Sequence, residues 1–211
     1  METYREHFKN RDYLISFFTG VIFVAIALFI QFRASMYATH SASSSVSDIV
    51  LSNTRVYDVG GIFVYGSVVL FLIVLVIALK RPKYFPFMLK SIATFTLIRS
   101  TFITLTHISS FPARASIDSV FFTEKAFQGI FSGDGLFFSG HTGLPFLLSL
   151  MFWNIKPLRY LFLGSSIMFG IVVLLGHIHY SIDVLSAFFI TYSIFQICII
   201  AFKKDWQTFN S

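Results

Sequence analysis

Long uninterrupted apolar runs constrain this chain more than any other feature of its sequence. A helix needs about 20 apolar residues to cross the hydrocarbon core of a membrane. Hydrophobic residues make up 55% of the 211 residues and charged residues only 12%, which is far below the charged fraction of an ordinary soluble domain. The sequence therefore predicts an all-α integral membrane protein.

Six runs are long enough to be membrane-spanning helices. They are residues 15–32, 60–79, 87–109, 136–154, 158–176 and 179–202. Pro157 separates the fourth run from the fifth, because proline ends one helix and begins another easily. The length leaves no room for a separate soluble module, so we interpret residues 1–211 as a single membrane domain. The lone cysteine, Cys198, lies inside an apolar run and predicts neither a disulfide nor a thiolate metal site.

The distribution of Lys and Arg predicts the orientation of these helices, since cytoplasmic loops carry the excess of positive charge. Ten of these residues fall in the amino-terminal segment, the second and fourth loops and the carboxyl-terminal tail. The opposite side has Arg33, Arg55, Arg114 and Lys125. Both termini are therefore expected in the cytoplasm. Because the basic residues lie in loops, we interpret the net charge of +6 as anchoring to lipid headgroups and not as a nucleic-acid site.

Two loops on the outward side are long enough to have structure of their own. The loop at residues 33–59 is rich in serine and is a candidate cap over the outer mouth of the bundle. In the loop at residues 110–135, the amphipathic stretch 120–127 is either an interfacial helix or an unstructured segment with scattered phenylalanines. The Phe- and Ile-rich composition fits a bacterial cytoplasmic membrane, with these loops facing the periplasm or exterior.

The chemistry-bearing residues gather in two short segments at outward helix ends, GDGLFFSGHT at residues 133–142 and HYSID at residues 179–183. His179 and Asp183 are spaced i and i+4, which places both side chains on one helix face. The carboxylate would fix the imidazole tautomer and raise the basicity of the far nitrogen, which suits attack on phosphorus. Asp183 as a merely solvated interfacial residue is the alternative. The cost of a charge inside the membrane favours a functional role.

His141 and Arg99 complete the expected phosphate chemistry. His141 follows Ser139 and Gly140 at a helix start, where backbone N–H groups attract anions, and it is placed to protonate a departing oxygen. The alternative is a helix cap with an incidental histidine. Arg99 lies in mid-span, and its fork geometry suits a phosphate. A buried salt bridge to Asp134, Asp183 or Asp58 is the competing interpretation.

Several further residues are secondary candidates. Asp134, Thr142 and Arg114 lie near the two segments, and His177 has either a substrate-gating role or a role in a metal site. With only six histidines in the chain, a metal site is the less favoured of these, and no metal or cofactor is expected. A serine-hydrolase mechanism on Ser139 lacks the G-x-S-x-G elbow. His107 is placed either in the site or at the membrane interface.

Ser139-Gly140-His141 and His179-x-x-x-Asp183, on six expected spans, resemble the type 2 phosphatidic acid phosphatase superfamily. The flanking Gly133-Asp134 and the sequence His-Tyr-Ser-Ile-Asp-Val more closely resemble its sphingomyelin synthase branch. The resemblance covers residues 60–201. The chain has Val74 in place of the phosphatase lysine that precedes Arg-Pro, and valines at 172 and 173 in place of Ser-Arg. It also differs from the sphingomyelin synthase branch by having Ser132 in place of a cysteine, by a spacing of four residues rather than three before Ser-Gly-His, and by lacking tandem arginines.

The resemblance implies a membrane enzyme that moves a phospho-headgroup between lipids on the outer leaflet. It makes His179 the nucleophile, Asp183 its partner and His141 the leaving-group acid, with Arg99, Ser139 and Gly140 holding phosphate. Phospholipid, ceramide or diacylglycerol are the implied lipid partners. A phosphatase acting on phosphatidate or prenyl pyrophosphate is the first alternative, and a non-catalytic scaffold or transporter is the second. The oligomeric state is not defined by the sequence.

Overall fold

Every apolar run expected to be helical contains a helix in the computed structural model, which describes residues 9–115 and 137–211. The elements are α2 (Arg11–His40), α3 (Ile49–Ser52), α4 (Gly60–Lys80), η1 (Pro82–Tyr84), α5 (Phe85–Leu105), α7 (Gly140–Met151), α8 (Lys156–Leu175), α9 (Ser181–Ala201) and α10 (Lys203–Asn210). All regular structure within the described ranges is helical, as the composition predicts.

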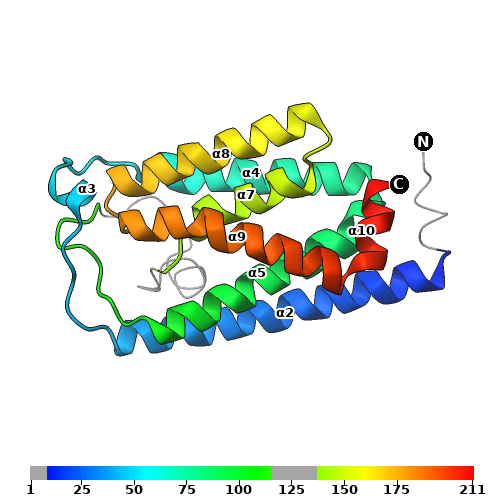
Figure 1. Cartoon of the computed structure of the whole chain (residues 1–211), viewed down its shortest axis with the longest axis horizontal. Helices are drawn as coiled ribbons and strands as arrows, with labels where there is room; N and C mark the ends of the chain where they lie inside the picture. Colours follow the sequence, from blue (N-terminus) through cyan, green and yellow to red (C-terminus); the bar gives the residue numbers. More distant parts are fainter. Residues whose placement is uncertain (1–8, 116–136) are drawn as a thin grey trace.

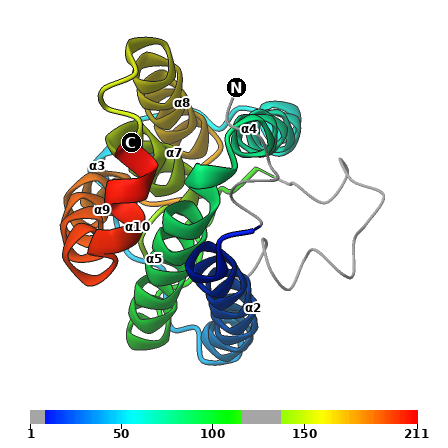
Figure 2. The same ribbon diagram turned by 90° about the vertical axis from the view of Figure 1, so that its right-hand side faces the viewer.

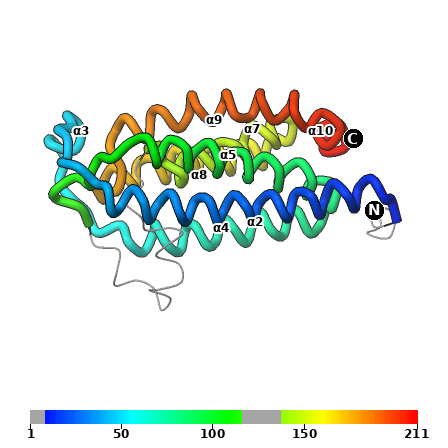
Figure 3. Tube along the Cα trace, turned by 90° about the horizontal axis from the view of Figure 1, so that it is seen from below, coloured from blue at the N-terminus to red at the C-terminus, as the bar shows by residue number. Residues whose placement is uncertain are grey.

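The long helices run side by side along the longest axis of the molecule (Figure 1). The end view in Figure 2 shows the short helix α7 in the middle, with α8, α9 and α5 around it, and α7 packs on all three. Helix α2 lies along α5 at the edge of the bundle, as Figure 3 also shows. The central position of α7 explains why most of its residues are buried although it has only 12 of them.

Aromatic side chains fill the interior of the bundle. Phe87, Phe95, Phe152 and Phe162 are at most 1% exposed and belong to one core cluster, in which Phe152 packs on both Phe162 and Tyr84. Each such ring buries a large apolar area, so a few phenylalanines contribute much of the packing. This packing accounts for part of the unusually high phenylalanine content of the chain.

The outer faces of the bundle are also apolar. Phe29, Phe71, Phe189 and Ile200 are between 64% and 79% exposed, on α2, α4 and α9. Among residues 9–115 and 137–211, four helices are long and apolar enough to cross a membrane, namely α2, α4, α8 and α9. Apolar surface on this scale is stable only against lipid or another apolar partner, and it indicates an integral membrane protein.

Helices α5 and α7 are not among these four helices. Helix α7 is only 12 residues long, and α5 carries both Lys90 and Arg99. Six spans with both termini in the cytoplasm therefore remain a prediction. The interfacial helix expected at 120–127 lies outside the described residues.

Several helix boundaries differ from those expected. Helix α2 continues to His40 and not only to residue 32, and it ends where the Ser41 N–H donates to the Tyr37 carbonyl oxygen. The third expected span ends at Leu105 instead of residue 109, and α7 begins at Gly140 instead of residue 136. The reason in the last case is capping, because the Ser139 side chain accepts from the Thr142 N–H and so fixes the first turn.

Candidate active site

The two histidine segments meet at the end of the bundle that carries α3 (Figure 1). Ser139 is the N-cap of α7, and its N–H donates to the carbonyl oxygen of Asp183 in the first turn of α9 at 3.1 Å. This backbone hydrogen bond joins two segments that lie about 40 residues apart in the chain. It places both helix amino-terminal ends side by side, so their partial positive charges point to the same region.

His179 and Asp183 form the pair that their spacing predicts. The His179 Nδ1 atom lies 3.4 Å from Asp183 Oδ2, and both side chains are buried. The same Oδ2 accepts from the Tyr180 N–H at 2.9 Å, which holds the carboxylate in the first turn of α9. With Nδ1 facing the carboxylate, the outer nitrogen Nε2 is the one left for chemistry.

Arg99 of α5 reaches the start of α7. Its Nε donates to the Phe138 carbonyl oxygen at 2.9 Å. A Cβ atom built on Gly140 would lie 3.3 Å from Arg99 Nε, so the arginine passes closely over this glycine. Arg99 also interacts electrostatically with Asp183. The guanidinium is thus at the junction of the two segments, as a phosphate-binding group would have to be.

His141 occupies an aromatic pocket at the same junction. Its ring centroid lies 4.1 Å from that of Phe63 in α4 and 6.0 Å from that of Phe169 in α8. His179 and Arg99 are both electrostatic neighbours of His141. The structure therefore brings together His141, His179, Asp183 and Arg99, the four side chains to which the sequence assigned the central chemistry.

The hydroxyl residues of the first segment have a structural role in the start of α7. The Ser139 Oγ accepts from the Thr142 N–H at 3.4 Å and from the Thr142 hydroxyl at 3.2 Å, and both residues are fully buried. The Thr142 carbonyl oxygen in turn accepts from Ser166 Oγ of α8 at 2.7 Å. These hydroxyls therefore serve to cap and fasten α7, and no hydrogen bond links Ser139 Oγ to a histidine among the described residues.

The loop between α2 and α4 covers the start of α9, and sequence reasoning missed the contact that fixes it. Asp48 caps α3 through the N–H groups of Val50 and Leu51, and its Oδ2 also accepts from the Ser181 N–H at 2.7 Å. Burial raises the pKa of Asp48, but the hydrogen bonds from Ser181, Leu51 and Val50 outweigh it and hold the pKa below its ordinary value of 3.8. The α3 cap was readable from Asp before an apolar turn, whereas the bond to Ser181 depends on the tertiary fold.

Tyr180 is held from two sides by the same group of loops. Its hydroxyl donates to the Ser109 carbonyl oxygen at 2.8 Å and accepts from the Val46 N–H at 3.3 Å. The Asp48 carboxylate holds Ser181, and the Tyr180 hydroxyl holds Tyr180. The two residues that follow His179 are therefore both fastened to the loops.

The secondary candidates lie around this centre. Arg114 donates to Ser110 Oγ at 3.1 Å, and the neighbouring Ala115 N–H donates to the Gly176 carbonyl oxygen. His177 is 2% exposed with φ 51°, it packs edge-on against Phe111, and within the described ranges neither ring nitrogen has a hydrogen-bond partner. Asp134 lies outside the described residues.

His107 belongs to the loop junction and not to the cluster of His141, His179, Asp183 and Arg99. Its Nε2 lies 3.0 Å from the Thr104 carbonyl oxygen, its ring packs on Tyr37, and its own carbonyl oxygen accepts from the Ser43 N–H. In the part of the chain that the structure describes, no three His, Cys, Asp or Glu side chains gather as a candidate metal site.

These features describe an all-helical membrane protein with a buried histidine and carboxylate cluster at one end. Residues 133–200 match the family model described as PAP2 superfamily C-terminal. The matched range contains both histidine segments, and it supports the type 2 phosphatidic acid phosphatase superfamily. With the apolar helices, it indicates a membrane protein of the lipid phosphatase or phosphotransferase type. Neither a curated protein nor a solved structure matches the chain.

Proposed function

We propose that the chain is a membrane lipid phosphotransferase that moves a phospho-headgroup between lipids on the outward membrane face. The observation that carries this proposal is the 3.1 Å hydrogen bond from the Ser139 N–H to the Asp183 carbonyl oxygen. This bond brings the candidate nucleophile His179, with its partner Asp183, close to the amino-terminal end of α7. That helix end can bind an anion, and it carries the candidate acid His141. The excess of Lys and Arg at the other end of the bundle supports the outward orientation.

In the first step, the Nε2 lone pair of His179 forms a bond to phosphorus. The bond between phosphorus and the leaving oxygen breaks, and that oxygen takes a proton from His141. In the second step, a hydroxyl of the acceptor attacks the phosphorus and gives its proton to His141, and the phosphorus–nitrogen bond breaks. Asp183 stabilises the positive charge that develops on the His179 ring.

The negative charge of the transferred group requires fixed positive charge nearby. Arg99 supplies it, together with the N-terminal N–H groups of α7 beside Gly140 and the helix dipole. The close passage of Arg99 over Gly140 supports this role, because a side chain at position 140 would occupy the same space.

Burial favours a lipid or alcohol acceptor over water. His179 is 6% exposed and Asp183 is 3% exposed, and the walls around His141 are phenylalanine rings. Phospholipid donors and a ceramide or diacylglycerol acceptor suit such a site. A phosphatase acting on phosphatidate or prenyl pyrophosphate is the second candidate, and the family match favours it directly. A non-catalytic scaffold or transporter is the rival from another class.

The test is turnover by the purified protein in detergent micelles. Phospholipids labelled in the phosphate are incubated with ceramide or diacylglycerol, and wild type is compared with His179→Gln. The matched control is His40→Gln, because His40 is exposed at the end of α2 and belongs to neither histidine segment. We expect a labelled lipid product and a labelled wild-type polypeptide, with loss of both in His179→Gln and neither lost in His40→Gln.

The other outcomes separate the alternatives. Release of inorganic phosphate without a new labelled lipid identifies a phosphatase. Lipid binding that is unaffected by His179→Gln, with no turnover of any lipid, identifies a scaffold or transporter and contradicts the catalytic proposal.

A further inference from the structure

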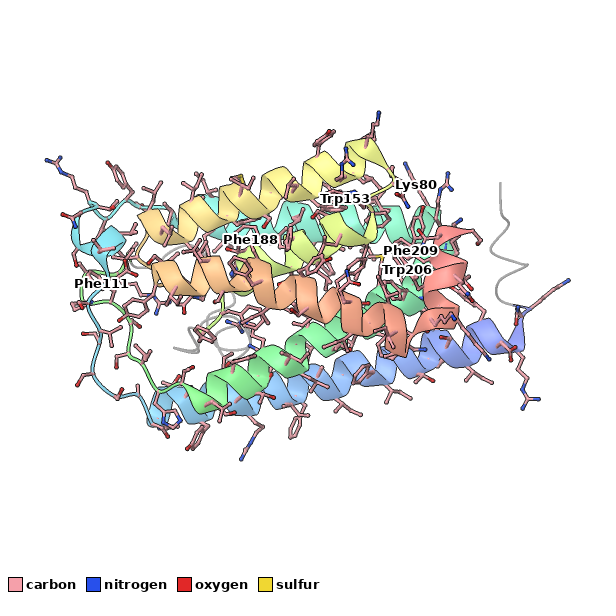
Figure 4. The ribbon with its side chains drawn as sticks, viewed as in Figure 1. Lys80, Phe111, Trp153, Phe188, Trp206 and Phe209 are labelled. Carbon is pink, nitrogen blue, oxygen red and sulfur yellow. The ribbon has the colours of Figure 1, made fainter. Side chains whose placement is uncertain are left out.

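A pocket with polar and apolar walls lies at the end of the bundle opposite to His179. Its volume is about 690 Å³, and its walls come from η1, the end of α7 and α10. Figure 4 shows the two ends, with Phe111 beside α3 and with Lys80, Trp206 and Phe209 at the other end. Phe111 packs on His177 and Tyr180, so it marks the end that carries the candidate active site.

Two cations line this pocket among the described residues, against one carboxylate, which belongs to Ser211 as the last residue. Arg81 is exposed at its edge, whereas Lys83 is only 5% exposed. The Lys83 ammonium lies 5.8 Å from the centroid of the Tyr84 ring, and within the described ranges it has no ion pair. A cation with so little access to water is costly unless an anion compensates it. The pocket is therefore built to receive negative charge.

The remaining walls suit a group that is polar at one end and apolar at the other. Tyr84 and Trp206 supply aromatic surface with polar tips, and the amides of Asn154 and Asn210 supply N–H donors. Tyrosine and tryptophan are enriched at the level of lipid headgroups. The pocket also lies at the basic end of the bundle, where α4 ends and α5 begins.

We propose that this pocket binds an anionic phosphate ester, as found in the headgroup of an acidic phospholipid in the leaflet opposite to the His179 site. Arg81 and Lys83 pair with the phosphate oxygens, and the amides of Asn154 and Asn210 donate to the remaining oxygens. Trp206 and Tyr84 pack against the apolar base of the headgroup. Since α10 forms one wall, the bound ligand also ties α10 to the bundle.

The Arg81–Pro82 pair lies at the same end of the bundle as this pocket, which Arg81 lines. Its resemblance to the arginine–proline pair of the phosphatase pattern does not place it in the candidate active site. Instead it lies at the other end, between α4 and α5, where the Pro82 carbonyl oxygen accepts from the Tyr13 hydroxyl at 2.8 Å.

The test measures binding by native mass spectrometry in neutral detergent and does not depend on turnover. The probes are phosphatidylglycerol, phosphatidylcholine and inorganic phosphate. We expect Arg81→Gln and Lys83→Gln each to weaken phosphatidylglycerol binding about tenfold, as loss of one charge-assisted hydrogen bond implies. Lys80→Gln is the matched control, because Lys80 is an exposed neighbour that does not line the pocket. It should bind like wild type.

Inorganic phosphate distinguishes the source of the ligand. If phosphate binds with the same dependence on Arg81 and phosphatidylglycerol does not, the site takes a soluble phosphate, which still supports an anion pocket. Because Arg81 is exposed, Arg81→Gln remains informative even if Lys83→Gln fails to fold. Equal binding by wild type and Arg81→Gln, or equal loss in Lys80→Gln, overturns the proposal, and neither result bears on catalysis by His179.

Discussion

Asp183 links the two histidine segments through separate parts of one residue. Its carboxylate faces His179 and accepts from the Tyr180 N–H, while its backbone carbonyl oxygen accepts from the Ser139 N–H. A substitution of the side chain therefore removes the contact with His179 but leaves the backbone bond to α7 in place. The spacing of His179 and Asp183 was sufficient to predict their contact, because a helix brings residues i and i+4 together.

Arg99 should be sensitive to replacement by lysine. Arg99→Lys keeps the positive charge but removes the Nε that donates to the Phe138 carbonyl oxygen, and it removes the planar fork that suits phosphate. We expect kcat/KM for lipid turnover to fall at least about tenfold. Arg33→Lys is the matched control, because Arg33 is exposed on α2. Wild-type turnover in Arg99→Lys would leave Arg99 with a merely structural role.

Asp48 predicts a specific dependence of stability on pH. Because its pKa in the folded protein lies below the ordinary value of 3.8, the ionised carboxylate stabilises the fold at every pH above that value, and this contribution is lost as the pH falls through the folded pKa. We expect Asp48→Asn to lower Tm by a constant amount from neutral pH down to about pH 5, and the two curves to converge in stronger acid. Thermal unfolding in detergent measures this.

The control for Asp48 is Asp12→Asn, since Asp12 is exposed in the first turn of α2. Its effect should be small at every pH. A difference between wild type and Asp48→Asn that persists unchanged in strong acid would contradict the assigned bond between the Asp48 carboxylate and the Ser181 N–H.

At the scale of elements, α7 decides where the site lies. It is short and central, and Ser139 caps its amino-terminal end. The helix therefore begins inside the bundle, beside α9. The sequence predicted a helix here because of its apolar run, but it gave no signal for a 12-residue length. The sequence also did not predict which helices pack against each other. Helices that are apolar on all sides carry no pattern that shows which face contacts which neighbour.

The carboxyl-terminal helix α10 was also missed. Its short run of mixed residues does not resemble a membrane span, and only the fold shows that Phe209 is buried against Tyr84 and Phe152. Lys90 of α5 pairs with Asp205 of α10 at 2.7 Å. A long-range ion pair of this kind has no local pattern in the sequence.

Packing of α7 predicts opposite effects for two glycines. A Cβ at Gly143 would lie 2.8 Å from the Phe95 ring and from Thr191 Oγ1, so Gly143→Ala should displace α7 and cost about 1–3 kcal/mol. Gly164 in α8 has nothing within 4 Å of such a Cβ, and Gly164→Ala should leave Tm unchanged or raise it. Thermal unfolding of both variants tests this, and equal Tm values would contradict the tight packing at Gly143. This contact makes Gly143 a packing glycine.

For the whole molecule, the two ends of the bundle differ in chemistry. One end carries the histidine cluster under the loops around α3, and the other carries α10 and most of the basic residues. Those at the α10 end are Lys9, Arg11, Lys80, Arg81, Lys83, Lys156, Arg159, Lys203 and Lys204. The sequence predicted this separation, because most Lys and Arg residues fall in the two terminal segments and in every second loop between the apolar runs.

This separation of charge predicts that the two ends lie on opposite sides of the membrane. The native Cys198 is buried, so single cysteines introduced elsewhere report their own accessibility. Asn53 is exposed beside α3 and Lys204 is exposed in α10. In intact cells, a membrane-impermeant maleimide should label Asn53→Cys at once and Lys204→Cys only after the membrane is permeabilised.

The unsubstituted protein should stay unlabelled. Labelling of Lys204→Cys in intact cells, with protection of Asn53→Cys, would place the histidine cluster in the cytoplasm and exclude an outer-leaflet substrate. Labelling of both would mean that the bundle does not separate two compartments.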